Sequence, residues 1–442
     1  MHHLARSFVP VGAKHLLPRC SKRVVVIGGG PTGLFCADRL RHHFEVTVID
    51  SKEFFEFTPG MLRALMDPAH YSRLTFDYRE VLERQLGVEF ICADASSLDA
   101  PLGPTSPGSV HIKSCSSGAH NKVGFDYCIV ATGVSNGRWK PRLQREAALH
   151  KSDETDRPVE KTLEVRRNSL RAWREEIASA HRVVIVGAGL VGVELAAELA
   201  HFQPRLKVRV VDGASSVLPQ LAEGARSYAS TWLQQHGVKL FLGKPFVPEL
   251  ITNDDHVIWC VGTKTRSDGI LDASVFKGNG QIRVNRRMQV LRRLFGSSLA
   301  ADAALPPFNV EPEKDPGSPV ELEPLGHGRI FAVGDAAAVE GVSTAQIIYH
   351  GEEMAAVAVA NIEAAEEISS PFAIGQGRRE AESGLPLLAC TSLGPQDGMF
   401  STQSELVATG ALAALQKQII EDTKMGALQG DPISSMLWMP VH

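Results

Sequence analysis

The sequence lacks the closely spaced cysteine pairs that mark a redox-active disulfide or a zinc site. Seven cysteines are present, and no two of them form a CxxC or CxxxxC motif. We therefore expect them to be buried, reduced thiols. They are Cys20, Cys36, Cys92, Cys115, Cys128, Cys260 and Cys390.

Long hydrophobic runs and a strong net charge are also missing. No run of about 18 consecutive apolar residues occurs, so we expect no membrane-spanning helix. The 46 basic and 50 acidic residues give a net charge of −4, which does not favour nucleic acid as a partner. With 442 residues, 44% of them hydrophobic, the chain is long enough for two or three domains with well-filled cores.

Acidic residues are absent from the first part of the chain. Residues 1–23 contain five basic residues, and the first acidic residue is Asp38. This balance is typical of mitochondrial transit peptides. Two prolines and a glycine interrupt any amphipathic helix there, so a short disordered leader over residues 1–20 is an equal alternative.

The sequence does contain two glycine-rich turns of the dinucleotide-binding type. They read Gly28-Gly-Gly-Pro-Thr-Gly33 and Gly187-Ala-Gly-Leu-Val-Gly192, and their first glycines lie 159 residues apart (187 − 28). Each turn follows an apolar segment, at 23–27 or 182–186, and precedes a helical one. This strand, turn and helix context distinguishes a nucleotide-binding turn from an ordinary glycine-rich loop.

An acidic residue ends the strand that follows each turn. Asp50 lies 22 residues after Gly28, and Asp212 lies 25 residues after Gly187. Such a carboxylate can accept hydrogen bonds from ribose hydroxyls, while the glycines allow a pyrophosphate to approach the helix start. Either aspartate alone would be read as a turn residue. Their shared register instead predicts two nucleotide cofactors and electron transfer between them.

The order of glycine turn, helix, strand ending in Asp, and apolar strand ending in glycine occurs twice. We therefore expect an α/β fold with two Rossmann-like domains and a small C-terminal domain. The expected leader covers residues 1–20. The expected domains cover residues 21–150 with 266–370, 151–265, and 371–442, with a disordered, proline-rich insertion at about 297–326.

Local patterns predict several further elements. Residues 101–121 are rich in Pro, Gly and Ser and predict a hairpin. Apolar spacing predicts helices over residues 165–177 and 343–362. In the C-terminal segment, Leu412, Leu415 and Ile419 fall on one face of a further helix.

Together these residues resemble the two-dinucleotide-binding flavoprotein reductases, over about residues 21–442. The strongest shared elements are the two turns, Ala131-Thr-Gly133, Gly192-Val-Glu194 and the segment 330–335. The resemblance implies a glutathione-reductase-type fold in which the first turn binds FAD and the second binds the nicotinamide cofactor. Because no CxxxxC pair exists, electrons must leave the flavin directly.

Two branches of this superfamily share further motifs with the chain. Phe57-Thr-Pro-Gly60 and Ala345-Gln346 are similar to motifs of type II NADH dehydrogenases. Met61-Leu-Arg63-Ala64 and the segment 392–398 resemble the ferroptosis-suppressor and apoptosis-inducing-factor-like flavoproteins, which reduce membrane quinones with NAD(P)H. We favour this second branch. His350 replaces the second glutamine of the usual AQxxxQ pattern, so the sequence does not define which residues form the quinone pocket.

The resemblance also implies which residues contact each cofactor. The expected FAD contacts are Gly28, Gly29, Gly30, Pro31, Thr32, Gly33, Asp50, Arg63, Ala131, Thr132, Gly133, Gly334, Asp335 and Gln346. The expected contacts to the nicotinamide cofactor are Gly187, Gly189, Gly192, Glu194, Asp212 and Gly262. Asp212 would repel a 2′-phosphate, and residues 213–220 contain no Lys or Arg to bind one. We therefore predict NADH rather than NADPH, and a measured preference for NADPH would contradict this.

Four side chains have two interpretations each. Asp335 accepts a ribityl hydroxyl, or it caps the following helix. Arg63 contacts FAD, or it is a surface arginine. Glu194 orients the nicotinamide, or it is a solvated acid at a helix start. His350 donates a proton to the reduced quinone, or it is a hydrogen-bonded helix histidine.

Gln346 is the remaining catalytic candidate, because the helix that begins near residues 343–346 is expected to direct its amino end at the flavin's pyrimidine edge. The expected function is hydride transfer from NADH to FAD, and then transfer of two electrons to a quinone in a nearby apolar pocket. Two alternatives stay open: a flavoprotein that controls partner binding through its redox state, and a reductase of a small iron-sulfur protein.

The C-terminal segment carries Lys417, Lys424 and Trp438 near its apolar face. We expect it to contact a membrane surface or to form a homodimer, or else to pack as an ordinary domain helix. From the basic N-terminal segment, and because quinones partition into lipid, we expect a mitochondrial or cytoplasmic protein that lies peripherally on a membrane.

Overall fold

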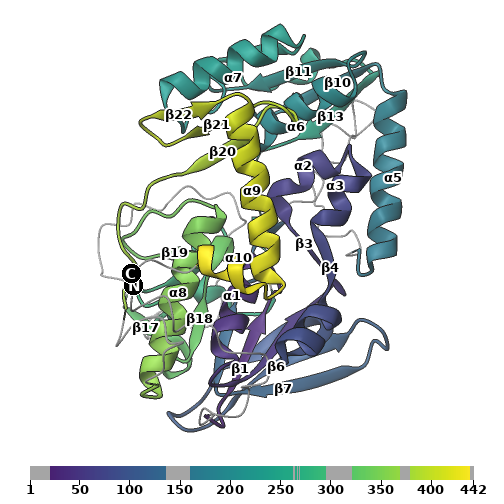
Figure 1. Cartoon of the computed structure of the whole chain (residues 1–442). Coiled ribbons are helices and arrows are strands. Elements are labelled where there is room, and N and C mark those ends of the chain that lie inside the picture. Colours follow the sequence, from purple (N-terminus) through teal and green to yellow (C-terminus); the bar gives the residue numbers. More distant parts are fainter. Residues whose placement is uncertain are drawn as a thin grey trace.

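The computed structural model describes residues 20–135, 160–261, 264, 265, 267, 269–294, 321–368 and 379–438 (Figure 1). In this part of the chain, the two largest sheets have seven and four strands. Each contains the strand that leads into one of the two glycine-rich turns. The mixed α/β architecture confirms the predicted fold class.

The larger sheet has the strand order β18-β8-β1-β2-β5-β6-β7. Neighbours from β18 to β5 are parallel, and β6 and β7 extend the sheet as an antiparallel hairpin. The strands are β1 (Arg23–Ile27), β2 (Glu45–Asp50), β5 (Glu89–Asp99), β6 (Gly108–Ser114), β7 (His120–Phe125), β8 (Tyr127–Val130) and β18 (Ile330–Ala332). Val24, Val25 and Val26 of β1 are fully buried, as expected for a strand covered on both faces.

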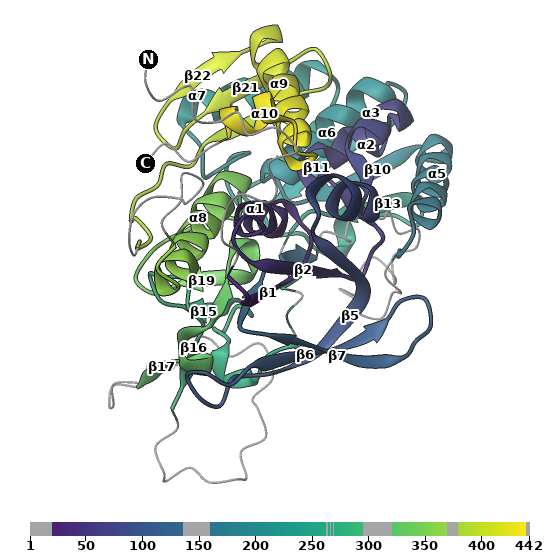
Figure 2. The same cartoon turned by 60° about the horizontal axis from the view of Figure 1, so that its bottom comes forward.

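Two helices cover one face of this sheet. They are α1 (Pro31–Leu40) and α8 (Ile348–Ala365), which lie side by side in both views (Figures 1 and 2). Ile348 lies 308 positions after Leu40 (348 − 40), so two helices that are far apart in the sequence cover the same sheet.

The smaller sheet is parallel, with the order β12-β11-β10-β13. Its strands are β10 (Arg182–Val186), β11 (Lys207–Asp212), β12 (Lys239–Leu242) and β13 (Asp255–Trp259). The associated helices are α5 (Leu163–Ser179), α6 (Leu190–Phe202) and α7 (Glu223–Gln235). Residues 192–199 of α6 are all buried, Glu194 and Glu198 among them.

The C-terminal segment forms a three-stranded antiparallel sheet followed by two helices. These elements are β20 (Ala389–Ser392), β21 (Gly398–Ser401), β22 (Leu406–Thr409), α9 (Ala411–Leu428) and α10 (Pro432–Leu437). Figure 1 shows α9 running from the smaller sheet's helices to the region of α1. On its way it passes the short helices α2 (Met61–Ala64) and α3 (Pro68–Arg73).

Several local predictions can be compared with these elements. The hairpin expected within 101–121 is confirmed by β6 and β7, and the helix expected over 165–177 is confirmed by α5. The helix predicted over 343–362 instead begins at Ile348 and ends at Ala365. Ile347 is extended, with φ −134° and ψ 152°, so the helical path begins only after it, and the Ala345 amide donates to Nδ1 of His350.

The predicted insertion at 297–326 was too long at its C-terminal end. Strand β17 (Leu322–Pro324) pairs with β16 (Leu291–Arg293), and a short turn follows it. Cross-strand pairing therefore fixes residues that composition alone suggested were disordered. Residues 295–320 and the expected leader up to residue 19 lie outside the described residues.

All seven cysteines are free thiols, as predicted. Only Cys36 and Cys128 are buried, and the other five are half-buried, so the expectation of full burial was wrong for those five. Among the described helices, none combines the length and the apolar character that crossing a bilayer requires.

Candidate functional site

The two glycine turns have the same geometry. Gly28 has a φ of +104° and Gly187 a φ of +115°, a conformation that side chains rarely adopt. A Cβ on Gly28 would lie 2.4 Å from the carbonyl oxygen of Ala131, and a Cβ on Gly187 would lie 2.8 Å from that of Cys260. Glycine is thus required by backbone conformation and by space at both positions.

Open space lies before each helix that follows a turn. Gly30 and Gly189 are the N-caps of α1 and α6, and a Cβ built on either would meet no heavy atom within 4 Å. The unpaired amides at a helix start, together with the helix dipole, form an anion site. Both openings therefore fit the pyrophosphate of a dinucleotide cofactor. Gly33 and Gly192 let each helix pack closely on its turn, because a Cβ on either residue would lie about 2 Å from a carbonyl oxygen of the turn.

The aspartates that end β2 and β11 accept hydrogen bonds from their glycine turns in the same way. Oδ2 of Asp50 accepts the Gly29 amide at 2.8 Å, and Oδ2 of Asp212 accepts the Ala188 amide at 2.6 Å. The other oxygen of each carboxylate accepts an amide two residues downstream. A carboxylate has about four acceptor sites, so each can still bind ribose hydroxyls.

The starts of α1 and α8 converge on the end of β18. A Cβ on Gly334 would lie 3.1 Å from Oγ1 of Thr32, and one on Gly351 would lie 2.8 Å from the same atom. Pro31 occupies the first turn of α1, where its missing N–H costs nothing. On the neighbouring strand end, Thr132 and Ser267 share a hydrogen bond of 2.8 Å between their hydroxyls.

Asp335 follows this convergence point in a short 3₁₀ turn, Gly334–Ala336. Burial raises the pKa of its carboxyl group to about 6. Within the described residues, no hydrogen bond to this carboxylate is formed, and helix α8 is capped at Ile347 rather than by Asp335. The capping interpretation was therefore wrong, and the carboxylate fits a hydroxyl donor such as the ribityl chain of FAD.

We expect Asp335→Asn to stabilise the apoprotein at neutral pH and to weaken FAD retention. The folded-state pKa of about 6 lies above the unfolded value of about 4, so the native protein loses stability as pH rises between them. Removing the charge should recover about 2 to 3 kcal/mol at about pH 7.5 and almost nothing below about pH 4. Urea denaturation of both apoproteins at the two pH values measures this, and equal stability at about pH 7.5 would contradict it.

A cavity of about 360 Å³ lies beside Gln346. Its lining is polar and comprises Thr265, Asn279, Gln281, Thr344 and Gln346. Nε2 of Gln281 donates to the carbonyl oxygens of Asp335 and Ala337, each at 3.1 Å, which ties the cavity to the Asp335 turn. Amides and hydroxyls fit the hydrogen-bonding edge of a pyrimidine ring, so this cavity is not the apolar pocket expected beside the flavin.

His350 is buried, with 3% of its surface exposed. Nδ1 accepts the Ala345 amide at 2.8 Å, and Nε2 lies 3.1 Å from the carbonyl oxygen of Pro386, to which it must donate. Both ring nitrogens are thus occupied by backbone groups. This geometry favours the hydrogen-bonded helix histidine over the proton donor.

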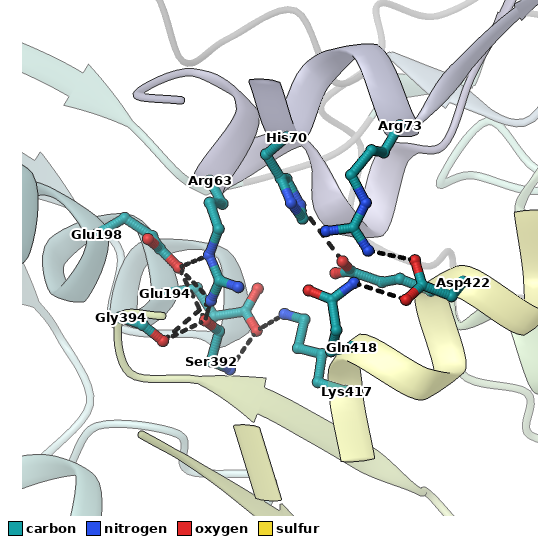
Figure 3. A network of polar contacts seen from close by, with 11 residues as sticks. Arg63, His70, Arg73, Glu194, Glu198, Ser392, Gly394, Lys417, Gln418 and Asp422 are labelled. Carbon is teal, nitrogen blue, oxygen red and sulfur yellow. Dashed lines mark hydrogen bonds and ion pairs between the residues drawn. The ribbon is translucent and has the colours of Figure 1, made fainter. Parts of the chain in front are cut away.

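Arg63 is a partner of protein groups rather than a surface arginine. Its Nε and Nη2 donate to Oε1 of Glu198 at 3.1 and 2.9 Å. Nη2 also donates to Oγ of Ser392 at 2.5 Å and to the Gly394 carbonyl at 2.9 Å (Figure 3). The arginine therefore links α2, α6 and the end of β20.

Glu194 is buried, so its interpretation as a solvated helix-start acid was wrong. Its Oε1 accepts the Ser392 amide at 2.7 Å and Nζ of Lys417 at 2.5 Å (Figure 3). Burial raises the pKa of this carboxyl group, and the Lys417 ammonium and the Ser392 amide act against that rise.

Sequence reasoning missed the partners of Glu194 and Arg63. Glu198 lies one turn after Glu194 on a helix that is otherwise apolar, and this i, i+4 pair of acids was the available signal. Lys417 and Lys424 were assigned to a surface-facing helix, but both are largely enclosed in ion pairs. Gly262 lies outside the described residues.

Two matched dinucleotide turns, with no cysteine pair between them, define a nucleotide-dependent oxidoreductase. The sequence comparison agrees with this class. The family model described as pyridine nucleotide-disulphide oxidoreductase matches residues 22–295, and the chain belongs to that family. By family it is an NAD(P)H-dependent flavin oxidoreductase, with FAD and a nicotinamide dinucleotide as its cofactors.

Individual relatives are more distant. The chain is 23% identical over 415 residues to apoptosis-inducing factor homolog B of Dictyostelium discoideum, covering 86% of this chain and 89% of that protein. It is 22% identical over 364 residues to ferroptosis suppressor protein 1 of Xenopus laevis, covering 77% and 80%. The NADH complex of NDH2 from Plasmodium falciparum is similar in fold, with a TM-score of 0.62, 12% identity, and 95% and 99% coverage.

Proposed function

We propose that this protein transfers a hydride from NADH to FAD and passes the two electrons to a quinone. The overall reaction is NADH + H⁺ + quinone → NAD⁺ + quinol. The observation that carries the proposal is the repeated turn, strand-end aspartate and open helix start, in a chain without a cysteine pair. A relative named type II NADH:quinone oxidoreductase, from Staphylococcus haemolyticus, supports the acceptor, with 23% identity over 51% of this chain.

Bound FAD would accept the hydride and release electrons to the acceptor, so the chain itself needs no nucleophile. The first turn with Asp50 would hold one pyrophosphate and ribose, and the second with Asp212 would hold the other. The carboxylate of Asp335 would accept a hydrogen bond from the flavin side chain. The amino end of α8 and the amides around Gln346 would stabilise negative charge at the polar cavity.

The expected domain bounds remain part of this proposal. Residues 21–150 with 266–370 would form the FAD domain, residues 151–265 the NADH domain, and residues 371–442 the C-terminal domain. The pairing of β18 with β8 supports a discontinuous first domain, since it returns a late segment to the first sheet.

The C-terminal segment is proposed as a contact surface for a membrane or for a second copy. Leu412, Leu415 and Ile419 expose 68%, 57% and 52% of their surfaces along α9. Quinones partition into lipid, which favours the membrane and a peripheral location, in a mitochondrion or the cytoplasm. A homodimer through the same face is the alternative.

Reoxidation of the reduced protein tests the acceptor. Anaerobic protein reduced by NADH is mixed with a short-chain ubiquinone, menadione or a small ferredoxin, and flavin absorbance is followed. We expect fast reoxidation by the quinones. Fast reoxidation by ferredoxin alone would favour the iron-sulfur reductase, and a long-lived reduced protein would favour the redox-controlled binding protein.

A further inference from the structure

A buried cluster of charged side chains joins the NADH-side helix α6 to the C-terminal helix α9. We call it the charge cluster, and its members are Arg63, His70, Glu194, Glu198, Lys417 and Glu421. They come from α2, α3, α6 and α9, and Figure 3 shows most of them directed toward one another. Charged groups are seldom buried unless they are paired, so the pairing inside this cluster decides what it does.

The two acids of α6 have different cations. Arg63, from the N-terminal part of the chain, pairs with Glu198. Lys417, from the C-terminal segment, pairs with Glu194 at 2.5 Å, with 13% and 11% of the two side chains exposed. The counter-ion of Glu194 thus lies 223 positions away in the sequence, on a helix that no nucleotide motif includes.

The position of Glu194 relates it to the NADH turn. It lies five residues after Gly189, which is about 7 Å along the helix axis. A group at this depth is well placed to face the nicotinamide end of a dinucleotide whose pyrophosphate sits at the helix start. Its amide partner, Ser392, also comes from the C-terminal segment.

Other charges also act on Glu194. Burial raises the pKa of its carboxyl group, and Glu198 acts in the same direction, whereas Lys417 opposes both. The titratable and charged groups packed around this pair from α2, α3, α6, β20 and α9 are Arg63, His70, Glu198, Cys390 and Glu421. Lys417 is the cation within hydrogen-bonding distance of Glu194.

We propose that Lys417 is a positioning residue for the nicotinamide site. It acts through Glu194: its ammonium, 2.5 Å from Oε1, pairs with the buried carboxylate and fixes its direction, so the C-terminal segment completes a site that the glycine turn begins. This inference rests on the proposed function and adds a specific residue to it.

Full-length, FAD-loaded Lys417→Met tests the inference by anaerobic stopped-flow reduction with NADH. We expect the limiting rate of flavin reduction to fall at least about fivefold, and Lys417→Arg to restore most of it. Reoxidation of chemically reduced Lys417→Met by menadione should match wild type. Asp422→Asn is the matched control: Asp422 lies on the same helix in an exposed pair with Arg73, and its loss should leave reduction unchanged.

Two further readouts separate positioning from general damage. The reduction rate of Lys417→Met should rise with pH more steeply than that of wild type, because loss of the ammonium that opposes burial raises the pKa of Glu194 further. The double variant Glu194→Gln with Lys417→Met should be no slower than Glu194→Gln alone. If Lys417→Met does not retain FAD, Lys417→Gln replaces it in the same measurements.

The inference would be overturned if Lys417→Met were reduced by NADH at the wild-type rate with a pH profile no steeper than that of wild type. It would also be overturned if the losses of reduction rate caused by Glu194→Gln and Lys417→Met added up in the double variant. Either result would leave the proposed function intact, provided that wild type is reduced by NADH. Wild type that NADH cannot reduce would instead contradict the proposed function itself.

Discussion

Gly30→Val is expected to yield folded protein that is colourless, and Gly189→Val to yield yellow protein that NADH cannot reduce. Both glycines have negative φ values, −67° and −75°, and open space where a side chain would project. Valine can therefore be accommodated by the apoprotein. It would occupy the space that a pyrophosphate needs, so each variant should lose one cofactor and keep the other.

The pair of variants also assigns each turn to its cofactor. Flavin content is read from visible absorbance after gel filtration, and reduction from anaerobic mixing with NADH. We expect each affected function to fall by at least about a hundredfold, since loss of the anion contacts and a steric clash act together. If Gly30→Val kept its flavin while Gly189→Val lost it, the assignment of the two turns would be reversed.

Arg63→Met should cost about 3 to 5 kcal/mol of unfolding free energy, because it leaves a buried carboxylate without its cation. Glu198 exposes 1% of its side chain, and Arg63 is its partner in the charge cluster. The matched control is Arg73→Met, which breaks a pair with Asp422 in which both side chains are about half exposed. That change should cost less than about 1 kcal/mol.

Denaturant titration in excess FAD measures both losses. The double variant Arg63→Met with Glu198→Gln should recover most of the stability, since removing both charges leaves neither one buried alone. Equal losses for Arg63→Met and Arg73→Met would show that burial does not control the strength of these pairs.

The sequence was most informative where a motif fixes local geometry. The two turns, their strands and the aspartates at positions 50 and 212 are held by contacts within about 25 residues, so spacing alone predicts them. The start of α8 could not be predicted in the same way. It depends on a hydrogen bond from Ala345 to His350 and on a contact from His350 to Pro386.

The charge cluster was beyond sequence reasoning for a different reason. Its pairs join residues separated by 135 to 351 positions, the largest separation being that of His70 and Glu421 (421 − 70), and nothing in the local pattern of α9 indicates that Lys417 turns inward. The apolar face of Leu412, Leu415 and Ile419 suggested a contact with a membrane or a second copy, with the lysines beside it, or an ordinary packed helix. In the structure the ion pair with Glu194 of α6 encloses Lys417, while Leu412, Leu415 and Ile419 are exposed.

Anaerobic titration of the purified protein with NADH shows whether two nucleotide cofactors exchange electrons without a disulfide. We expect a yellow protein whose flavin absorbance disappears after one equivalent of NADH per flavin, without a thiol that becomes alkylatable on reduction. A colourless protein that takes up no added flavin, or a bound flavin that NADH leaves oxidised, would contradict this expectation.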